Sequence, residues 1–175
     1  MNHALNAYAR AITPKDAELL KQALLFFQNY QAMNLVPDII SHSHVVKAYT
    51  NAGRIKDAFH VRDIMLEAFG RVPLPVHTIL IHGCIRHRRL DLAWSTFNEL
   101  RLRYAQEPDV MLYSVMIHAC AKNGEIERAR QLFDDMVAKE LTPTDVTLNA
   151  LVNACARRKE CYGEVWEWVA RMKEV

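Results

Sequence analysis

Hydrophobic residues recur along the chain with the 3.6-residue period of an amphipathic α-helix. The clearest stretch covers 125–140, and its apolar positions are Ile126, Ala129, Leu132, Phe133, Met136 and Val137. The preceding stretch, 110–122, is also apolar along one side. Asn123-Gly124 separates the two stretches, and glycine readily ends a helix because it adopts the left-handed conformation without strain. The pattern therefore predicts two helices joined by a short turn.

This helix pair is one copy of a repeat of 35 to 36 residues. Three sets of residues keep that spacing, or twice it: the small Ala58, Ala93 and Ala129, the larger Met65, Leu100, Met136 and Met172, and the prolines Pro37, Pro108 and Pro143. A period of this length is typical of solenoid proteins. We divide the chain into complete units at 39–73, 74–109 and 110–144, and incomplete units at about 1–38 and 145–175.

One helix pair of this size cannot bury its apolar side alone, so neighbouring units must stack. We therefore expect an all-α fold, an α-solenoid of stacked antiparallel helix-turn-helix repeats of about 35 residues, as a single domain over 1–175. The 5 glycines and 6 prolines among 175 residues are too few for the many turns of an all-β fold. The sequence has no run of about 18 apolar residues, so we expect no membrane partner.

The cysteines follow the same period. Cys84, Cys120 and Cys155 occupy the eleventh place of successive units. Equivalent places in stacked helices lie about 10 Å apart, whereas the ligands of one zinc ion all lie about 2.0–2.3 Å from the metal. We therefore expect buried core cysteines and no metal site, with Cys161 in a turn and equally without chemistry.

The sequence contains no motif of an established catalytic chemistry. Four of the eight histidines fall at repeated places, His82 and His118 at the ninth place of their units and His42 and His77 at the fourth. The metalloprotease motif H-E-x-x-H, the zinc deaminase signature, the G-x-S-x-G elbow and the glycine-rich phosphate loops are all missing from it. We predict that the chain is not an enzyme and has no catalytic residue, cofactor, metal or small-molecule substrate.

A polar stripe follows the first helix of every unit. Residues five, nine and thirteen share it because they lie at i, i+4 and i+8. In chain order, the fifth places hold Ser43, Thr78, Ser114 and Asn149, the ninth places Lys47, His82, His118 and Asn153, and the thirteenth places Asn51, Arg86, Lys122 and Arg157. Stacked units align the cations into a positive track suited to an RNA backbone, although the net charge is only +2. The expected backbone-binding residues are Lys47, Arg86, Lys122 and Arg157.

The second residue of each unit is apolar and offers an edge against which an unstacked base could lie. These residues are Ile40, Pro75, Met111 and Val146. A solvated helix face is the alternative interpretation, because cations near a helix C-terminus are favoured by the dipole alone. Asp38 and Asp109, directly before a first helix, would then serve only as N-caps. Spacing alone supports the RNA groove and the solvated face about equally.

In its motifs the chain resembles the pentatricopeptide repeat family. The resemblance is clearest in PDVMLYSVMIHACAKNGEIERARQLFDDMVAKELTPT at 108–144, and it covers essentially residues 1–175. The first-helix pattern, the Asn-Gly break, the alanine, the methionine and the Pro-Asp junction occur together. The resemblance implies a right-handed superhelix that binds single-stranded RNA in mitochondria or plastids. It also implies that each unit reads one base, mainly through its fifth and last residues.

By this resemblance the base-reading residues are Asn2, Asp38, Ser43, Thr78, Asp109, Ser114, Thr144 and Asn149. Asn2 with Asp38 is similar to a uracil-reading pair, and Thr78 with Asp109 to a guanine-reading pair. Ser43 with Pro73 departs from the usual combinations, as does Ser114 with Thr144. Asn149 has no recognisable partner at the end of its unit.

Three functions remain open from the sequence. The leading one is a non-catalytic single-stranded RNA-binding protein of organellar, mitochondrial RNA metabolism or translation. The alternative is a protein–protein scaffold subunit of a large ribonucleoprotein such as the mitochondrial ribosome, with rRNA and protein partners and no reading of base sequence. A third is the repeat segment of a longer chain whose catalytic domain lies elsewhere.

Overall fold

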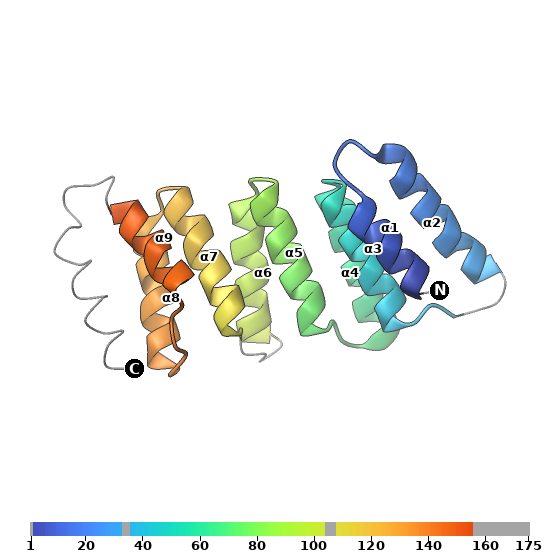
Figure 1. The fold of residues 1–175 in the computed structure, drawn as a ribbon. Coiled ribbons are helices and arrows are strands. Elements are labelled where there is room, and N and C mark those ends of the chain that lie inside the picture. The colour runs from blue at the N-terminus through green and yellow to red at the C-terminus, as the bar shows by residue number, and fades with distance from the viewer. Residues whose placement is uncertain (1, 33–35, 104–107, 156–175) are drawn as a thin grey trace. The chain divides into compact units, whose positions relative to one another are not determined.

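The computed structural model describes residues 2–32, 36–103 and 108–155. Every regular element in these ranges is a helix, which confirms the expected all-α class (Figure 1). The helices are α1 (Asn2–Ala11), α2 (Ala17–Ala32), α3 (Ile39–Asn51), α4 (Ile55–Phe69), α5 (Leu74–Arg86), α6 (Leu90–Arg103), α7 (Val110–Lys122), α8 (Ile126–Ala138) and α9 (Asp145–Cys155). None of these helices is long and apolar enough to cross a membrane.

Contacts divide the chain into two compact blocks, an N-terminal block of residues 1–104 and a C-terminal block of residues 105–175. In the N-terminal block, α1 to α6 form three helix pairs, and α3 packs against both α1 and α5. In the C-terminal block, α7 packs against both α8 and α9. Within each block, the first helices of successive units therefore lie side by side. The single domain expected over 1–175 stays a prediction.

The first helices of the units begin at Ile39, Leu74, Val110 and Asp145, the residues at which the periodicity starts each unit. Aspartate caps two of them. The carboxylate of Asp38 accepts the Ser41 N–H at 2.7 Å, and that of Asp109 accepts the Leu112 N–H at 2.8 Å. Each bond satisfies one of the N–H groups that a helix start leaves without a partner. The expectation that both aspartates are N-caps is confirmed.

The turn between the two helices of a unit needs one residue in the left-handed region. Gly53 holds this place between α3 and α4 with φ 77°, and Gly124 holds it between α7 and α8 with φ 79°. Arg88 holds it between α5 and α6 with φ 58°. A residue with a side chain costs about 1–2 kcal/mol in this conformation, so the α5–α6 turn, which has Arg88 there, is the most strained of the three.

The periodic small residues and cysteines form the core. Ala58, Ala93 and Ala129 have no exposed surface, and neither have Cys84, Cys120 and Cys155. None of the three cysteines forms a disulfide, and burial raises the pKa of Cys84 to about 11 and that of Cys120 to about 12. Both thiols therefore stay protonated and are poor nucleophiles and ligands. The expectation of buried core cysteines is confirmed for these three, while Cys161 lies outside the described residues.

A glycine inside α5 lets two first helices approach closely. A Cβ placed on Gly83 would lie 2.8 Å from Cβ of Thr50 on α3. Directly after α5, the Nε2 atom of His87 lies 3.0 Å from the Thr50 carbonyl oxygen, and the His87 ring packs against Gly53. These contacts fix α5 against α3 and set the width of the groove between them.

Candidate nucleic-acid interface

The polar stripe of the N-terminal block lines a groove between α3 and α5. The lining residues are Lys47, Thr50, Asn51, Thr78, Ile79, His82, Gly83 and Arg86. Three predicted site residues, Lys47, Thr78 and Arg86, therefore share one groove. Lys47 and Thr78 are half-buried and Arg86 is exposed. The stacking of α3 on α5 brings these three side chains together, as the stripe predicts.

The thirteenth residues of neighbouring units are joined by hydrogen bonds. Nη1 of Arg86 donates to Oδ1 of Asn51 at 2.7 Å, and Nδ2 of Asn51 donates to the backbone carbonyl of Ala9 at 2.7 Å. This chain of bonds runs from α5 across α3 to α1. A guanidinium has five N–H donors, so Arg86 keeps others for a phosphate while Asn51 fixes its position.

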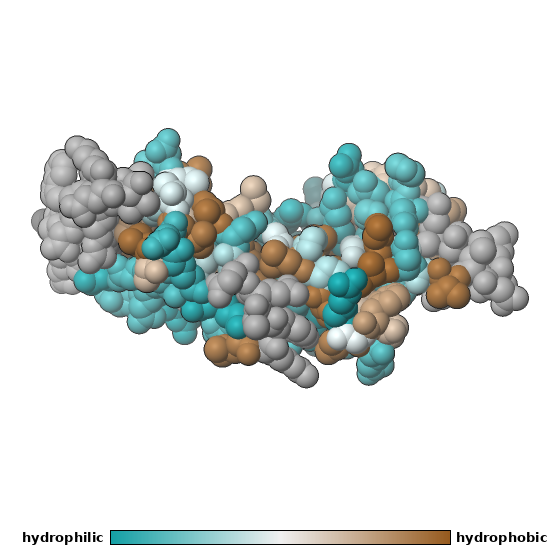
Figure 2. Space-filling view, turned by 90° about the horizontal axis from the view of Figure 1, so that it is seen from below, coloured by the Kyte–Doolittle hydropathy of each residue, from teal (hydrophilic) through white to brown (hydrophobic). Residues whose placement is uncertain are grey.

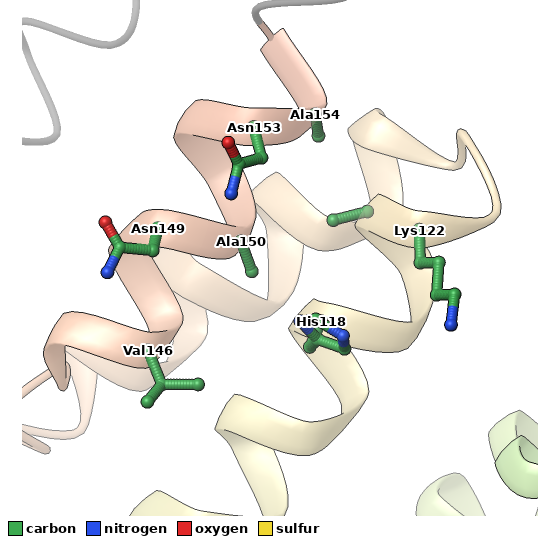
Figure 3. Close-up of a pocket in the computed structure, with 8 residues that line it drawn as sticks. His118, Lys122, Val146, Asn149, Ala150, Asn153 and Ala154 are labelled. Atoms are coloured by element: carbon green, nitrogen blue, oxygen red, sulfur yellow. The ribbon is translucent and has the colours of Figure 1, made fainter.

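The stripe of the C-terminal block lines a second, wider groove between α7 and α9. Figure 3 shows His118 and Lys122 projecting from α7, and Val146, Asn149 and Asn153 from α9. The groove has a volume of about 740 Å³, within the range of small-ligand sites. Lys122 and Asn149, both predicted site residues, are exposed in it. The predicted residue Arg157 lies outside the described residues.

The second residues of the units are exposed although three of them are large and apolar. The exposed fraction is 51% for Ile40, 65% for Met111 and 61% for Val146, and Pro75 is exposed as well. Val146 lies at the groove between α7 and α9. Figure 2 shows one face of the molecule, on which apolar surface forms separate patches among polar surface. The edges that the sequence offers to unstacked bases are therefore accessible to solvent.

The structure brings Asn2 and Asp38 together, as the proposed reading pair requires. Nδ2 of Asn2 donates to Oδ2 of Asp38 at 3.1 Å. The hydroxyl of Ser41 lies 3.0 Å from Oδ1 of Asn2 and 2.6 Å from Oδ1 of Asp38. Hydrogen bonds from the Ser41 side chain and backbone, and from Asn2, lower the pKa of Asp38 below its ordinary value. Asp38 is therefore an ionised acceptor surrounded by donors.

Ser114 and Thr144 are joined indirectly, through Thr147. Ser114 donates to the Val110 carbonyl at 2.7 Å, its Oγ lies 2.7 Å from Oγ1 of Thr147, and Oγ1 of Thr147 lies 3.0 Å from Oγ1 of Thr144. Each hydroxyl has one hydrogen to donate. Because Ser114 uses its hydrogen on Val110, Thr147 must donate to Ser114, and Thr144 to Thr147. No hydroxyl of this group has a hydrogen left for a ligand.

The remaining fifth residues make the same local bond. Ser43 donates to the Ile39 carbonyl at 2.7 Å, and Thr78 donates to the Leu74 carbonyl at 3.1 Å. Such bonds to the carbonyl four residues back are common for hydroxyls inside helices. Ser43 has no polar partner in Pro73, whose side chain carries no donor or acceptor. Thr78 and Asp109 lie in different blocks, so their pairing stays a prediction.

Sequence reasoning missed Ser41 and Thr147, the third residues of their units. Both are polar and have no exposed surface, and both contact the fifth residue of the preceding unit. A hydroxyl at the third place in two of the four described units was the available signal. The corresponding residues of the other two, Val76 and Leu112, are apolar.

Comparisons with known proteins agree with this geometry. The profile of the PPR repeat family matches residues 108–157, and that of the PPR repeat matches residues 76–103. A search of curated proteins gives no match.

Among solved structures, the chain is similar to the maize pentatricopeptide repeat protein PPR10, with a TM-score of 0.68 and 20% identity over 99% of this chain and 24% of that one. PPR10 in complex with an 18-nt psaJ RNA element gives a TM-score of 0.75 and 18% identity, with the same coverage. The PPR domain of Arabidopsis thaliana protein-only RNase P 1 in complex with tRNA gives 0.72 and 13% identity, over 89% of this chain and 81% of that one.

The chain thus spans about a quarter of the length of PPR10. The structural likeness shows the fold of stacked helical repeats, and the two profile matches place the repeat in both blocks. The chain thus contains PPR repeats at residues 76–103 and 108–157 and is similar in fold to pentatricopeptide repeat proteins.

Proposed function

We propose that the chain binds single-stranded RNA along the stripes of its first helices and catalyses no reaction itself. The observation that carries this proposal is the pair of grooves, α3–α5 and α7–α9, each lined by the polar stripe and by a cation. Cations in such a groove neutralise phosphates, and the exposed second residues give unstacked bases an apolar surface. The proposed organelle, mitochondrion or plastid, and the proposed process, RNA metabolism or translation, rest on the family resemblance alone.

Asn2 is the fifth residue best suited to read a base. An amide side chain has two N–H donors and two acceptor lone pairs on its oxygen. Asp38 takes one donor, and the amide oxygen shares the single hydrogen of the Ser41 hydroxyl with the Asp38 carboxylate. One N–H donor and one acceptor lone pair of the amide remain for a base. Uracil offers an acceptor and a donor to such a side chain, which is compatible with the uracil preference that the family resemblance implies.

The hydroxyl units support weaker reading. Ser43, Thr78 and Ser114 each donate their hydrogen to their own helix and keep only acceptor lone pairs. This observation favours the second candidate function, a scaffold in a large ribonucleoprotein such as the mitochondrial ribosome. In that role the chain would contact rRNA through phosphates and pack against protein partners. The RNA complexes of PPR10 and of the RNase P 1 repeat domain support an RNA partner under either function.

Anisotropy titration of short labelled single-stranded RNAs with the whole chain tests the proposal. We expect the double variant Arg86→Ala, Lys122→Ala to bind more weakly. The slope of log affinity against log salt should fall by about 0.7 for each phosphate that the variant no longer neutralises. Lys21→Ala, Lys56→Ala is the matched control, because it removes two exposed cations from the second helices α2 and α4. Equal losses of affinity in both variants, or none, would contradict the groove.

A native purification separates the two candidate functions. If the chain acts as a scaffold, it stays in a large assembly after ribonuclease removes accessible single strands. If it binds a single-stranded target, the same treatment releases it. Binding of free RNA that is unaffected by competing protein extract would argue against the scaffold.

A further inference from the structure

We propose that Ser41 and Thr147, the third residues of their units, are positioning residues that set the base preference of the preceding unit. We call them the third-place hydroxyls. The inference rests on the proposed RNA-binding function and adds a third determinant to the fifth and last residues. Neither hydroxyl would touch the base, because both side chains have no exposed surface.

Ser41 orients the amide of Asn2. Its single hydrogen is shared between the amide oxygen of Asn2, 3.0 Å from Oγ, and Oδ1 of Asp38, 2.6 Å from Oγ, while Oδ2 of Asp38 accepts the amide N–H at 3.1 Å. The amide is thus held at both ends, oxygen toward the hydroxyl and nitrogen toward the carboxylate. The free donor and the free lone pair then have fixed positions for a base. With an apolar residue in place of Ser41, the amide oxygen of Asn2 loses its share of this hydrogen, so the amide turns more freely.

Thr147 positions a different pair of side chains, those of Ser114 and Thr144. It lies between Ser114 and Thr144, 2.7 Å from the oxygen of the first and 3.0 Å from that of the second. In this group Thr144 donates to Thr147 and Thr147 donates to Ser114. This order of hydrogen bonds fixes which oxygen lone pairs face outward. In each block, therefore, one third-place hydroxyl contacts both the fifth and the last residue of the preceding unit.

Helix capping alone does not account for these contacts. A capping role needs only bonds within the first turn, such as the Ser41 N–H to Asp38. The hydroxyl of Ser41 also reaches Asn2, 39 residues earlier, and that of Thr147 reaches Ser114, 33 residues earlier. The units that begin with α5 and α7 have Val76 and Leu112 at this place. Ser43 and Thr78 consequently receive no such bond, and we infer weak base discrimination at both.

The test measures base preference rather than affinity alone. Four RNAs that differ in the one base facing the Asn2 unit are titrated with wild type, Ser41→Ala and Ser41→Thr, after a base scan has located that position. One net hydrogen bond is worth about fivefold. We expect Ser41→Ala to lower the preference for uracil about fivefold, with affinity for the other three RNAs unchanged, and Ser41→Thr to restore it. Val76→Ala is the matched control, a truncation at an equivalent place without a hydroxyl.

The outcomes separate this inference from the proposed function. Failure of wild type to bind any of the RNAs overturns the proposed function. Binding of wild type without a base preference, or a preference that Ser41→Ala leaves intact, overturns the third-place hydroxyls alone. If Ser41→Ala unfolds, as circular dichroism would show, Thr147→Val repeats the test in the C-terminal block, because valine keeps the shape of threonine and removes the hydroxyl. An unchanged preference in that variant also overturns the inference.

Discussion

The amide nitrogen of Asn2 lies 3.1 Å from a carboxylate oxygen of Asp38, across 36 residues of sequence. The two residues meet because α1 packs against α3, so that the start of α1 lies beside the cap of α3. The fifth residue of one unit and its last residue are thereby placed at one end of the polar stripe. This geometry allows a single base edge to contact both side chains.

Replacement of Asn2 by alanine should abolish base preference at that position. The change removes the remaining donor and acceptor, and a pair of base-edge hydrogen bonds discriminates by about 1–3 kcal/mol. Affinity for RNAs without uracil there should stay within about twofold of wild type. His3→Ala, an exposed neighbour on the same helix, is the control. A uracil preference that survives in Asn2→Ala would show that another residue reads the base.

The exposed second residues should contribute to RNA affinity without contributing to stability. Met111→Asp with Val146→Asp places two carboxylates where bases would lie, so affinity should fall at least about tenfold through weaker stacking and repulsion of phosphates. Both side chains are mostly exposed, so the melting temperature should change by less than about 4 °C. Leu25→Asp, an exposed apolar residue on α2, should leave RNA binding unchanged. Equal decreases of affinity in both variants would indicate a general charge effect.

Local and periodic features of this fold could be predicted from the sequence. The period gave the start of each first helix, the aspartate caps and the buried alanines and cysteines, because each depends on spacing within one chain segment. It also placed Lys47, Thr78 and Arg86 on one stripe, and they line one groove. Residues at equivalent places in stacked units necessarily come to lie in a row.

Features that depend on how one helix is rotated against the next could not be predicted. The bond from Arg86 to Asn51 and the hydroxyl contacts of Ser41 and Thr147 require side chains of two helices to meet at hydrogen-bond distance. Periodicity specifies the face of a residue but not that distance. Arg88 in a left-handed turn was equally unexpected, because two other units use glycine there.

Alanine at Gly83 should destabilise the N-terminal block despite the higher helix propensity of alanine. The propensity gain is about 1 kcal/mol, but the new methyl group would meet Thr50 at 2.8 Å, and overpacking of this kind costs about 1–3 kcal/mol. We therefore expect a net loss of up to about 2 kcal/mol in urea unfolding. The double variant Gly83→Ala, Thr50→Ser, which removes the threonine methyl group, should recover part of it. A more stable single variant would contradict the tight packing of α5 on α3.

Below neutral pH the protein should lose stability through His77. This side chain on α5 has no exposed surface, and burial lowers its pKa to about 4, while Glu99 on α6 raises it and Arg62 on α4 lowers it. Unfolded histidine titrates near pH 6.5. Between about pH 6.5 and pH 4 the unfolded chain therefore binds a proton that the folded chain does not, so stability falls as the pH falls through this window. The loss between about pH 7 and pH 4.5 should be on the order of 2 kcal/mol in urea unfolding.

His77→Gln isolates this contribution, because glutamine has a comparable polar shape and does not titrate. The variant should be less stable than wild type at neutral pH, since it replaces a packed ring. Between about pH 7 and pH 4.5 its free energy of unfolding should nevertheless fall by about 2 kcal/mol less than that of wild type, because glutamine binds no proton in either state. Asp38 contributes below this window, because its lowered pKa adds stability that is lost only as the pH falls below about 4. Parallel pH profiles for the two proteins would show that His77 is not buried in its neutral form.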